Sequence, residues 1–386
     1  MNTVAEPAPP GAPAAASLEW LRTGDQAYST MLEAIDGAQH TVRFETYIFK
    51  RGEPGDRIRA ALISAAQRGV RVYALLDAWG STELPADYWN GLIHNGGEFR
   101  WFNRPRFLKG TFRNHRKLLV VDDRSAYVGG YNIAPEHCGD GVTGGWKDIG
   151  IFLHGSLAAH LGETFDKMFT RAELKHRAFI RVMKTGNHAW LPHEAGTIII
   201  SGPGRGFSQL KRSLKADLRK ATDVRIMAAY FLPTYRLRRT LLKVARRGHK
   251  VQLIVPGKSD VLLSQLATRK LYQSLMRAGV EIYEYEPQVL HAKMIIIDDS
   301  VYVGSANLDT RSLYINYELS VRLNSHDTAE EARELFDDTL TRCRRVNLSQ
   351  WRKSRGFIAR WKEKFAYWLL TRFDLYLARK QLNDLR

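Results

Sequence analysis

Short apolar segments alternate with longer amphipathic stretches along most of the chain. In the first half, residues 42–49 (VRFETYIF) and 70–77 (VRVYALLD) have the apolar and β-branched content of buried strands. The stretch between them has a helical pattern and ends in LISAAQRGV at residues 62–70. Strands and helices that alternate at this spacing predict α/β units with mostly parallel strand pairing and helices on both faces of the sheet.

The second half repeats this pattern. A predicted strand, VRIMAAYFLP (224–233), is followed by a helical segment with a glycine stop, RTLLKVARRGHK (239–250), and by the strand VQLIVP (251–256). Each half then enters a very apolar strand, makes a tight turn and returns through a strand that contains glycine. We expect this hairpin to add an antiparallel member to each sheet.

The same patterns divide the chain into four expected parts. Residues 1–16 are rich in Ala and Pro and lack the continuous apolar segment of a signal peptide, which predicts a disordered leader. Residues 17–190 and 191–345 are expected to form the two α/β domains, because Gly, His and Pro interrupt the periodicity between them. Residues 346–386 form a basic, aromatic tail.

Charge narrows the class of partner. The chain has 386 residues, a soluble composition and a net charge of +18, which indicates a polyanionic partner: nucleic acid, an anionic membrane surface or a phosphate-rich substrate. Cys138 and Cys343 are too few for a disulfide framework and are expected to be reduced thiols. No apolar run approaches the ~18 residues of a membrane span. We therefore expect a cytoplasmic protein whose membrane contact is peripheral.

One motif occurs twice, as NHRKLLVVDDRSAYVGGYN at residues 114–132 and HAKMIIIDDSVYVGSAN at residues 291–307. Residues two apart on a strand face the same side, so each copy places a histidine beside a lysine. An aspartate follows seven residues after each histidine, and an asparagine follows the glycine of the return strand. The turn is one residue longer in the first copy. The paired residues are His115 with His291, Lys117 with Lys293, Asp122 with Asp298, and Asn132 with Asn307.

These residue types suit the chemistry of a phosphodiester. Lysine and asparagine can hold the non-bridging oxygens and offset the charge that grows on them in the transition state. One histidine can attack phosphorus while the other protonates the leaving oxygen. A metal site is the competing interpretation. It is disfavoured because a lysine is the nearest same-face neighbour of each histidine, and because the sequence has no compact cluster of ligands.

Together the two copies, HRKLLVVD…GGYN and HAKMIIID…GSAN, resemble the double HKD motif of the phospholipase D superfamily. The resemblance extends from about residue 17 to residue 345. It implies two similar α/β/α sandwich domains packed face to face, with one shared active site that is complete within one chain and uses no metal or cofactor.

The resemblance also implies roles for individual residues. His115 is expected to be the nucleophile that forms a phosphohistidine, and His291 the acid and then the base. Phosphate-binding positions match Lys117, Asn132, Lys293, Ser305 and Asn307, and histidine-orienting carboxylates match Asp148 and Glu318. The motif residues Asp122 and Asp298 are expected to fix the architecture rather than to take part in bond-making.

Within the superfamily, ETYIF, YFLP, NLDTRSLYINYE and NIAPEH…WKD are similar to segments of cardiolipin synthases, of the short type without N-terminal membrane helices. This implies transfer of a phosphatidyl group between two phosphatidylglycerols, giving cardiolipin and glycerol. The motifs cannot separate a transferase from a lipid hydrolase, since water can replace the acceptor alcohol. A nuclease of the superfamily and a catalytically inactive membrane-binding protein are further alternatives. Nucleic acid is not the expected partner, and the oligomeric state stays open.

The tail suggests how the protein reaches a lipid. On a helix, apolar residues fall along one side, with Trp368 at its edge and basic residues interspersed: Ile358, Trp361, Phe365, Leu369, Phe373, Tyr376 and Leu377. Aromatic residues beside Lys and Arg suit an anionic membrane surface, here the cytoplasmic face of the cell membrane. The alternative is that this helix packs on the enzyme's own surface.

Overall fold

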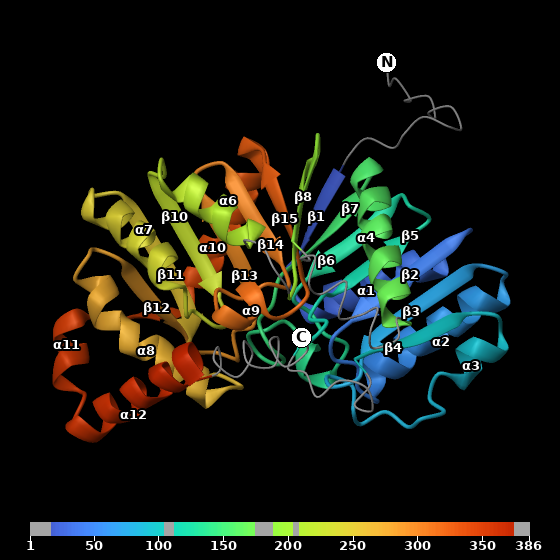
Figure 1. Ribbon diagram of the computed structural model, residues 1–386, viewed down its shortest axis with the longest axis horizontal. Coiled ribbons are helices and arrows are strands. Elements are labelled where there is room, and N and C mark those ends of the chain that lie inside the picture. The colour runs from blue at the N-terminus through green and yellow to red at the C-terminus, as the bar shows by residue number, and fades with distance from the viewer. Residues whose placement is uncertain (1–16, 104–111, 174–187, 204–207, 374–386) are drawn as a thin grey trace, which may run out of the picture.

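The computed structural model describes residues 17–103, 112–173, 188–203 and 208–373. The predicted leader and the last thirteen residues of the tail, including Tyr376 and Leu377, lie outside this part of the chain. Two sheets, one from each half, lie side by side with helices around them (Figure 1). In the described part of the chain, no helix is both long and apolar enough to cross a membrane.

The first sheet has the strand order β1-β7-β6-β5-β2-β3-β4. Its strands are β1 (Ser17–Leu21), β2 (Thr41–Thr46), β3 (Arg71–Asp77), β4 (Glu98–Phe102), β5 (Leu118–Val121), β6 (Ser125–Gly129) and β7 (Gly150–His154). Helices α1 (Gly24–Asp36), α2 (Glu53–Gln67) and α3 (Asn90–His94) pack on one face, and α4 (Ser156–Ala172) packs on the other.

The second sheet has the order β16-β12-β11-β10-β13-β14-β15-β9-β8. Its strands are β8 (Ala189–His193), β9 (Gly196–Ser201), β10 (Asp223–Ala228), β11 (Lys250–Pro256), β12 (Glu281–Tyr285), β13 (Lys293–Ile297), β14 (Ser300–Gly304), β15 (Glu318–Asn324) and β16 (Cys343–Arg345). Helices α6 (Gln209–Leu218), α7 (Tyr235–Arg246) and α8 (Leu262–Met276) cover one face, α10 (His326–Thr341) covers the other, and the short α9 (Thr310–Tyr314) follows β14. The predicted repeat of two α/β/α units is thus confirmed.

The expectation of mostly parallel pairing is wrong. Parallel pairing links β2, β3 and β4 in the first sheet and β10, β11 and β12 in the second, while the other described pairs are antiparallel. A parallel partner needs a long crossover connection, usually a helix. The chain between β4 and β5, and between β12 and β13, carries no described helix, so the histidine-lysine strand enters antiparallel to its neighbour.

Alternate side chains of the apolar run in each motif pack into two different cores, one on each face of the sheet. Along β5, Leu118 and Val120 face a core shared with α4, whereas Leu119 and Val121 face the core under α1 and α2. Residues of β13 alternate in the same way between the shared core and the core under α6 and α7. The shared core also takes residues from α4, α10 and the inner faces of both sheets, and so joins the halves.

The hairpins after these strands have the predicted difference in length. Val121 pairs with Ser125 across a three-residue turn, whereas Ile297 pairs with Ser300 across a two-residue turn. Each turn begins with an aspartate of positive φ, 52° for Asp122 and 49° for Asp298, a conformation that aspartate tolerates better than most residues.

The tail continues as α11 (Leu348–Lys353), α12 (Phe357–Trp368) and a final turn at Leu369–Phe373. Helix α12 packs along α8, with Ala366 buried. Tyr367 of this helix and Leu370 of the final turn pack against the core under α6 and α7. Its aromatic side faces away from the protein. The helix thus packs on the second domain through one face and leaves Ile358, Trp361 and Phe365 of the predicted apolar stripe exposed.

Candidate active site

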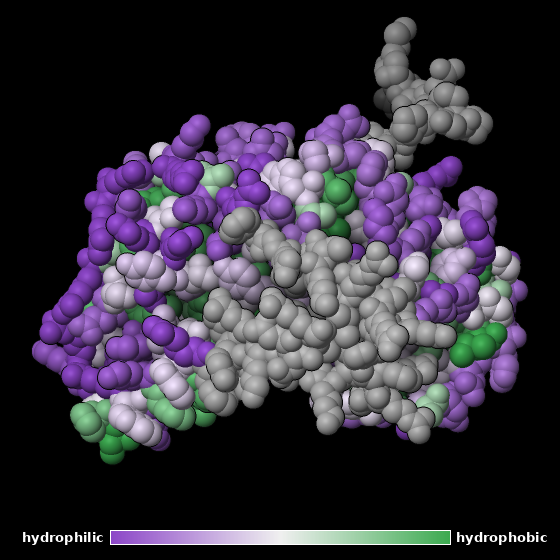
Figure 2. Space-filling model, in the orientation of Figure 1, coloured by the Kyte–Doolittle hydropathy of each residue, from purple (hydrophilic) through white to green (hydrophobic). Residues whose placement is uncertain are grey.

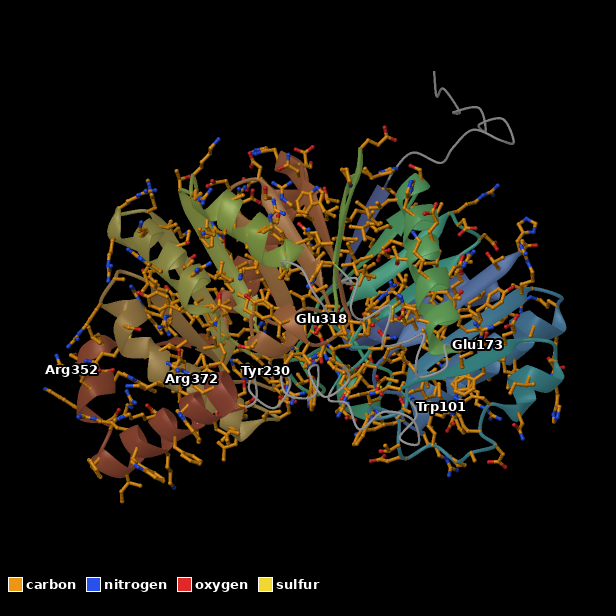
Figure 3. All side chains as sticks on the ribbon, in the orientation of Figure 1. Trp101, Glu173, Tyr230, Glu318, Arg352 and Arg372 are labelled. Carbon is orange, nitrogen blue, oxygen red and sulfur yellow. The ribbon has the colours of Figure 1, made fainter. Side chains whose placement is uncertain are left out.

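The main chain of each motif is bound to the opposite half of the molecule. Asn114 forms a parallel bridge with Tyr317, and the His115 amide donates to the Tyr317 carbonyl at 2.9 Å. In the same way Lys147 bridges Leu290, and the His291 amide donates to the Lys147 carbonyl at 2.7 Å. In each bridge the residue that follows carries a carboxylate, Glu318 after Tyr317 and Asp148 after Lys147. Each half therefore places a carboxylate beside the histidine of the other half. Glu318 accordingly lies at the centre of the molecule (Figure 3).

The imidazole of His115 contacts the carboxylate of Glu318, the first residue of β15. His115 Nδ1 lies 3.0 Å from Glu318 Oε2, and Ser305 donates to the same oxygen at 2.5 Å. The Leu319 amide in turn donates to the Ser305 hydroxyl at 3.0 Å, which fixes the serine. Burial lowers the pKa of His115 although Glu318 acts to raise it. A carboxylate on Nδ1 places that proton there and leaves Nε2 of the neutral ring as a free lone pair.

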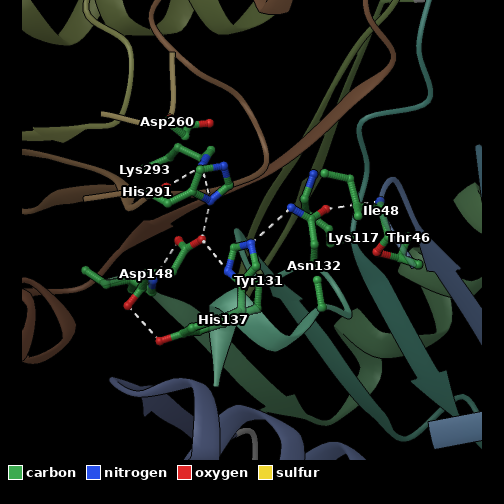
Figure 4. A network of polar contacts seen from close by, with 12 residues as sticks. Thr46, Ile48, Lys117, Tyr131, Asn132, His137, Asp148, Asp260, His291 and Lys293 are labelled. Atoms are coloured by element: carbon green, nitrogen blue, oxygen red, sulfur yellow. Dashed lines mark hydrogen bonds and ion pairs between the residues drawn. The ribbon is translucent and has the colours of Figure 1, made fainter. Parts of the chain in front are cut away.

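The imidazole of His291 contacts the carboxylate of Asp148, which lies just before β7. His291 Nδ1 lies 2.5 Å from Asp148 Oδ2, while the Ile149 amide donates to Oδ1 at 2.8 Å (Figure 4). A Cβ at Gly130 would lie 2.1 Å from Asp148 Oδ1, so only glycine fits beside this carboxylate. Burial lowers the pKa of His291 well below its ordinary value, and Lys293 lowers it further.

Two buried lysines complete the charged part of the site. Lys117 Nζ donates to the His115 carbonyl at 2.7 Å, and Lys293 Nζ donates to the His291 carbonyl and lies 2.9 Å from His291 Nδ1. Burial lowers the pKa of Lys117 to about 7 and also lowers that of Lys293. Asp260 lies beside Lys293, where it accepts from the Tyr230 hydroxyl at 2.6 Å (Figure 4). An anion bound between the two lysines would favour their charged forms.

The motif asparagines are also buried. The Asn132 carbonyl oxygen accepts from the Ile48 amide at 3.2 Å, and its amide nitrogen lies 3.3 Å from His137 Nε2. Asn307 Oδ1 is a buried oxygen with no hydrogen-bond partner among the described residues. A buried, unsatisfied amide oxygen beside Lys293 is an acceptor that a ligand hydroxyl could complete.

The motif aspartates lie at the other end of their strands. Asp122 accepts from the amides of Gln39, His40 and Thr41 at 2.7 to 2.8 Å, and Asp298 accepts from the amides of Thr222 and Asp223. Partial burial acts to raise the pKa of Asp122, but the amide donors outweigh it and hold that pKa below its ordinary value. These contacts join each hairpin to the start of the neighbouring strand, as expected of residues that fix the architecture.

A third imidazole, His137, belongs to the site and was not singled out from the sequence. It stands five residues after Asn132, where the second copy has Ser312, so the comparison of the repeats does not reveal it. One group of three residues in the described part of the chain has donor atoms close enough together to hold a metal ion: His137, Asp148 and His291. Lys293 Nζ lies 2.9 Å from Nδ1 of His291, and this ammonium group makes the cluster a poor fit for a cation.

Comparisons with known proteins agree with this geometry. A family model described as cardiolipin synthase, phospholipase D-like domain, matches residues 31–168 and 214–340. Cardiolipin synthase B of Salmonella typhi is 33% identical over 341 residues, which cover 86% of this chain and 82% of that protein. Cardiolipin synthase 1 of Bacillus anthracis is 30% identical, over 85% of this chain and 67% of that protein. A crystal structure of phosphatidylserine synthase from Haemophilus influenzae Rd KW20 shares the fold, with a TM-score of 0.71, 13% identity and 94% of each chain covered.

Proposed function

This chain belongs to the cardiolipin synthase family of phospholipase D-like proteins, and from that premise we propose that it condenses two phosphatidylglycerols into cardiolipin and glycerol. One observation carries the proposal: two imidazoles, each with Nδ1 on a buried carboxylate, lie with two buried lysines at the boundary of the halves. This arrangement supplies a nucleophile, an acid and a binding place for one phosphate.

In the first step, His115 Nε2 attacks the phosphorus of a phosphatidylglycerol. The bond between phosphorus and the glycerol oxygen breaks, and His291 gives its Nε2 proton to that oxygen, so glycerol leaves. Glu318 holds the proton on His115 Nδ1 and stabilises the positive charge that forms on the ring. Lys117 and Lys293 face the non-bridging oxygens, where negative charge grows in the transition state.

In the second step, the terminal hydroxyl of another phosphatidylglycerol attacks the phosphohistidine. The hydroxyl proton moves to His291 Nε2, the new phosphorus–oxygen bond forms, and the bond to His115 breaks. Cardiolipin leaves, and both imidazoles return to their first protonation states. The same site would act as a hydrolase if water entered at this step, so exclusion of water decides the product.

The pKa shifts of the two imidazoles bear on this division of roles. Burial lowers the pKa of His115, which keeps the nucleophile neutral at neutral pH. Burial, Lys293 and Lys117 all lower the pKa of His291, which opposes its role as an acid in the protein alone. A phosphodiester carries one negative charge and would raise the pKa of His291 when it binds. The substrate thus generates the acid that its own cleavage needs.

Purified protein incubated with phosphatidylglycerol vesicles and a chelator tests this function. We expect cardiolipin and free glycerol in equal amounts, and neither product from the His115→Ala variant. Phosphatidic acid in place of cardiolipin would make the protein a lipid hydrolase. Cleavage of DNA without turnover of any lipid would overturn the assignment.

We further propose that α12 holds the enzyme on the anionic, cytoplasmic face of the membrane. Five large apolar side chains of this helix are 46% to 83% exposed: Phe357, Ile358, Trp361, Phe365 and Trp368. They form a hydrophobic patch at the lower left of Figure 2, where Figure 1 places α12. Arg360 and Lys364 lie beside them, and each basic residue near an anionic surface contributes about 1 kcal/mol.

Co-sedimentation with vesicles tests the membrane contact. The double variant Trp361→Ser/Phe365→Ser is expected to lose about tenfold or more of its binding to phosphatidylglycerol vesicles, because both side chains would be removed from the bilayer. Its activity on dispersed short-chain phosphatidylglycerol should be retained. Ile93→Ser, which removes a comparably exposed side chain from α3 in the other half, is the matched control. Equal binding by all three proteins would contradict the proposal.

A further inference from the structure

His137 is a buried imidazole that neither reaction step uses. It is 1% exposed, and its ring centroid lies 5.1 Å from that of His291. Nε2 lies 3.3 Å from the Asn132 amide nitrogen. Nδ1 lies 3.8 Å from Asp148 Oδ2, beyond hydrogen-bond distance, and it is a buried atom with no hydrogen-bond partner among the described residues. Figure 4 shows the ring between these two groups, with Asp148 and His291 on one side and Asn132 on the other.

The hydrogen-bond partners determine which nitrogen of His137 carries the proton. The Ile48 amide can only donate, so the Asn132 atom 3.2 Å from it is the carbonyl oxygen. The other atom of that side chain is therefore the NH₂ nitrogen, which can only donate and needs an unprotonated Nε2 on His137. The neutral ring then carries its proton on Nδ1, on the side of Asp148.

The charges around the ring keep it neutral. Burial lowers the pKa of His137 well below its ordinary value, and His291, Lys293 and Lys117 lower it further, while Asp148 acts in the opposite direction. A neutral imidazole has one donor and one acceptor. Here the acceptor faces an amide at a phosphate-binding position, and the donor faces the carboxylate that orients His291.

The two halves differ at this point in a way that explains the third imidazole. Glu318 receives a hydrogen bond from the Ser305 hydroxyl. The equivalent position in the first motif is Gly130, where a side chain would collide with Asp148. The Asp148 carboxylate therefore lacks a serine donor, and the Nδ1–H of His137 faces its Oδ2 atom from 3.8 Å instead.

We infer that His137 is a positioning residue that couples the phosphate-binding amide of Asn132 to the carboxylate that orients His291. Its Nε2 keeps the Asn132 amide turned towards the site, and its Nδ1–H keeps Asp148 turned towards His291. The inference rests on the proposed function, because it assigns a role within the same reaction. It adds a residue that links substrate binding to the state of the general acid.

Three substitutions separate the two contacts. The amide of glutamine superposes on Nε2 of a histidine, so His137→Gln retains an acceptor for Asn132 and loses the donor to Asp148. The amide of asparagine superposes on Nδ1, so His137→Asn retains the donor and loses the acceptor. His137→Leu loses both. Tyr272→Phe, which removes a buried hydrogen bond of 3.0 Å to Glu284 away from the site, is the control for lost stability alone.

Steady-state kinetics with phosphatidylglycerol over a range of pH give the readout. His137→Gln is expected to lower kcat about three- to tenfold. It should also raise the apparent pKa that His291 gives to the pH profile of kcat (its pH limb) by about half a unit to one unit, because a carboxylate without the His137 N–H holds the His291 proton more tightly. His137→Asn is expected to raise KM about three- to tenfold with the wild-type pH limb. His137→Leu should show both changes, and Tyr272→Phe neither.

Nitrogen NMR of histidine-labelled protein tests the tautomer without any turnover. Among the neutral imidazoles we expect one signal, with the proton on Nδ1, that persists down to the acid limit of folding and that is lost in His137→Gln while the signals of His115 and His291 remain. Equal losses of kcat in all three His137 variants, with wild-type KM and pH limb, would reduce His137 to a packing residue and overturn the inference. Wild-type protein without turnover of phosphatidylglycerol would instead refute the proposed function, while the nitrogen spectrum would still decide the tautomer.

Discussion

The layers beneath the two motifs differ although the motifs carry the same reactive side chains. Under the first motif lies a buried polar network, in which Arg116 pairs with Glu45 at 3.1 Å and Asn114 donates to the same carboxylate at 2.7 Å. Arg116 also donates to the Thr164 hydroxyl at 2.8 Å. Burial raises the pKa of Glu45, although Arg116 acts to lower it.

Under the second motif the matching positions are apolar. Leu290 and Ala292 take the places of Asn114 and Arg116, and strand register makes Met227 the counterpart of Glu45. Both versions hold an imidazole and a lysine at the boundary of the halves. The same histidine and lysine are therefore supported by an ionic layer in one half and by an apolar layer in the other.

The largest expected difference between the halves concerns the two histidines. His115→Asn and His291→Asn should each reduce cardiolipin formation by about 10⁴-fold or more, because each removes a group that forms or breaks a bond. A phosphatidyl ester of p-nitrophenol separates them, since this leaving group needs no proton. Release of nitrophenolate should recover in His291→Asn and stay absent in His115→Asn. The reverse pattern would exchange the roles of the two residues.

The buried ion pair gives the next largest effect. Arg116→Ala leaves the Glu45 carboxylate buried without its partner and should lower the free energy of unfolding by about 3–5 kcal/mol. The double variant Glu45→Met/Arg116→Ala copies two of the three second-half positions, with Asn114 kept, and should recover most of that loss. Denaturant unfolding measures both. If the double variant is no more stable than the single one, the two supporting layers are not interchangeable.

Lys117→Met is expected to abolish transfer and yet to stabilise the protein by about 1–3 kcal/mol at neutral pH, since it removes a buried cation without a buried anion of its own. The pKa of Lys117 in the folded protein is about 7, below the ordinary value for lysine. Wild-type stability should therefore fall as the pH drops from about 10.5 to about 7 and change no further through this group below that.

Thermal unfolding of the wild type and Lys117→Met across this pH range tests the effect. The two proteins should differ most at and below neutral pH and converge in alkaline solution. A constant difference at all pH values would mean that Lys117 keeps its ordinary pKa in the folded protein.

The smallest effect concerns the serine that only the second motif has. Ser305→Gly gives Glu318 the glycine environment of the first motif and removes one hydrogen bond to the carboxylate. We expect kcat to fall about three- to tenfold with little change in KM. Ser305→Ala should have the same effect, because the hydroxyl and not the shape matters. A large rise in KM would instead indicate that Ser305 binds the substrate phosphate directly.

Local features of the fold could be predicted from the sequence. The repeat, the strands and helices of both halves and the unequal hairpin turns follow from periods of two and 3.6 residues and from turn chemistry. The direction of the histidine-lysine strand could not, since it depends on how the chain returns after β4 and β12. The main-chain bridges Asn114–Tyr317 and Lys147–Leu290 join segments far apart in sequence, which no local pattern reveals.

Some residues of the candidate site could likewise be predicted from the sequence, and others could not. His115 and His291 stand out because each is followed by a lysine two residues later and an aspartate seven residues later. His137 occurs once, in a short turn between strands, and only the packing of the two halves brings it to Asp148 and His291. Ser305 was expected to bind phosphate, but its hydrogen bonds go to Glu318 and to the Leu319 main chain.

The crossed contacts have a stereochemical consequence. Each half holds the imidazole of one motif at their common boundary. In the proposed mechanism, a phosphorus atom between them is attacked by His115 from one side and by the alcohol assisted by His291 from the other. Glycerol would leave from the second side, and the acceptor hydroxyl would enter there. Two in-line displacements invert the phosphorus centre twice. A phosphorothioate diester of single handedness should therefore give a product of retained configuration.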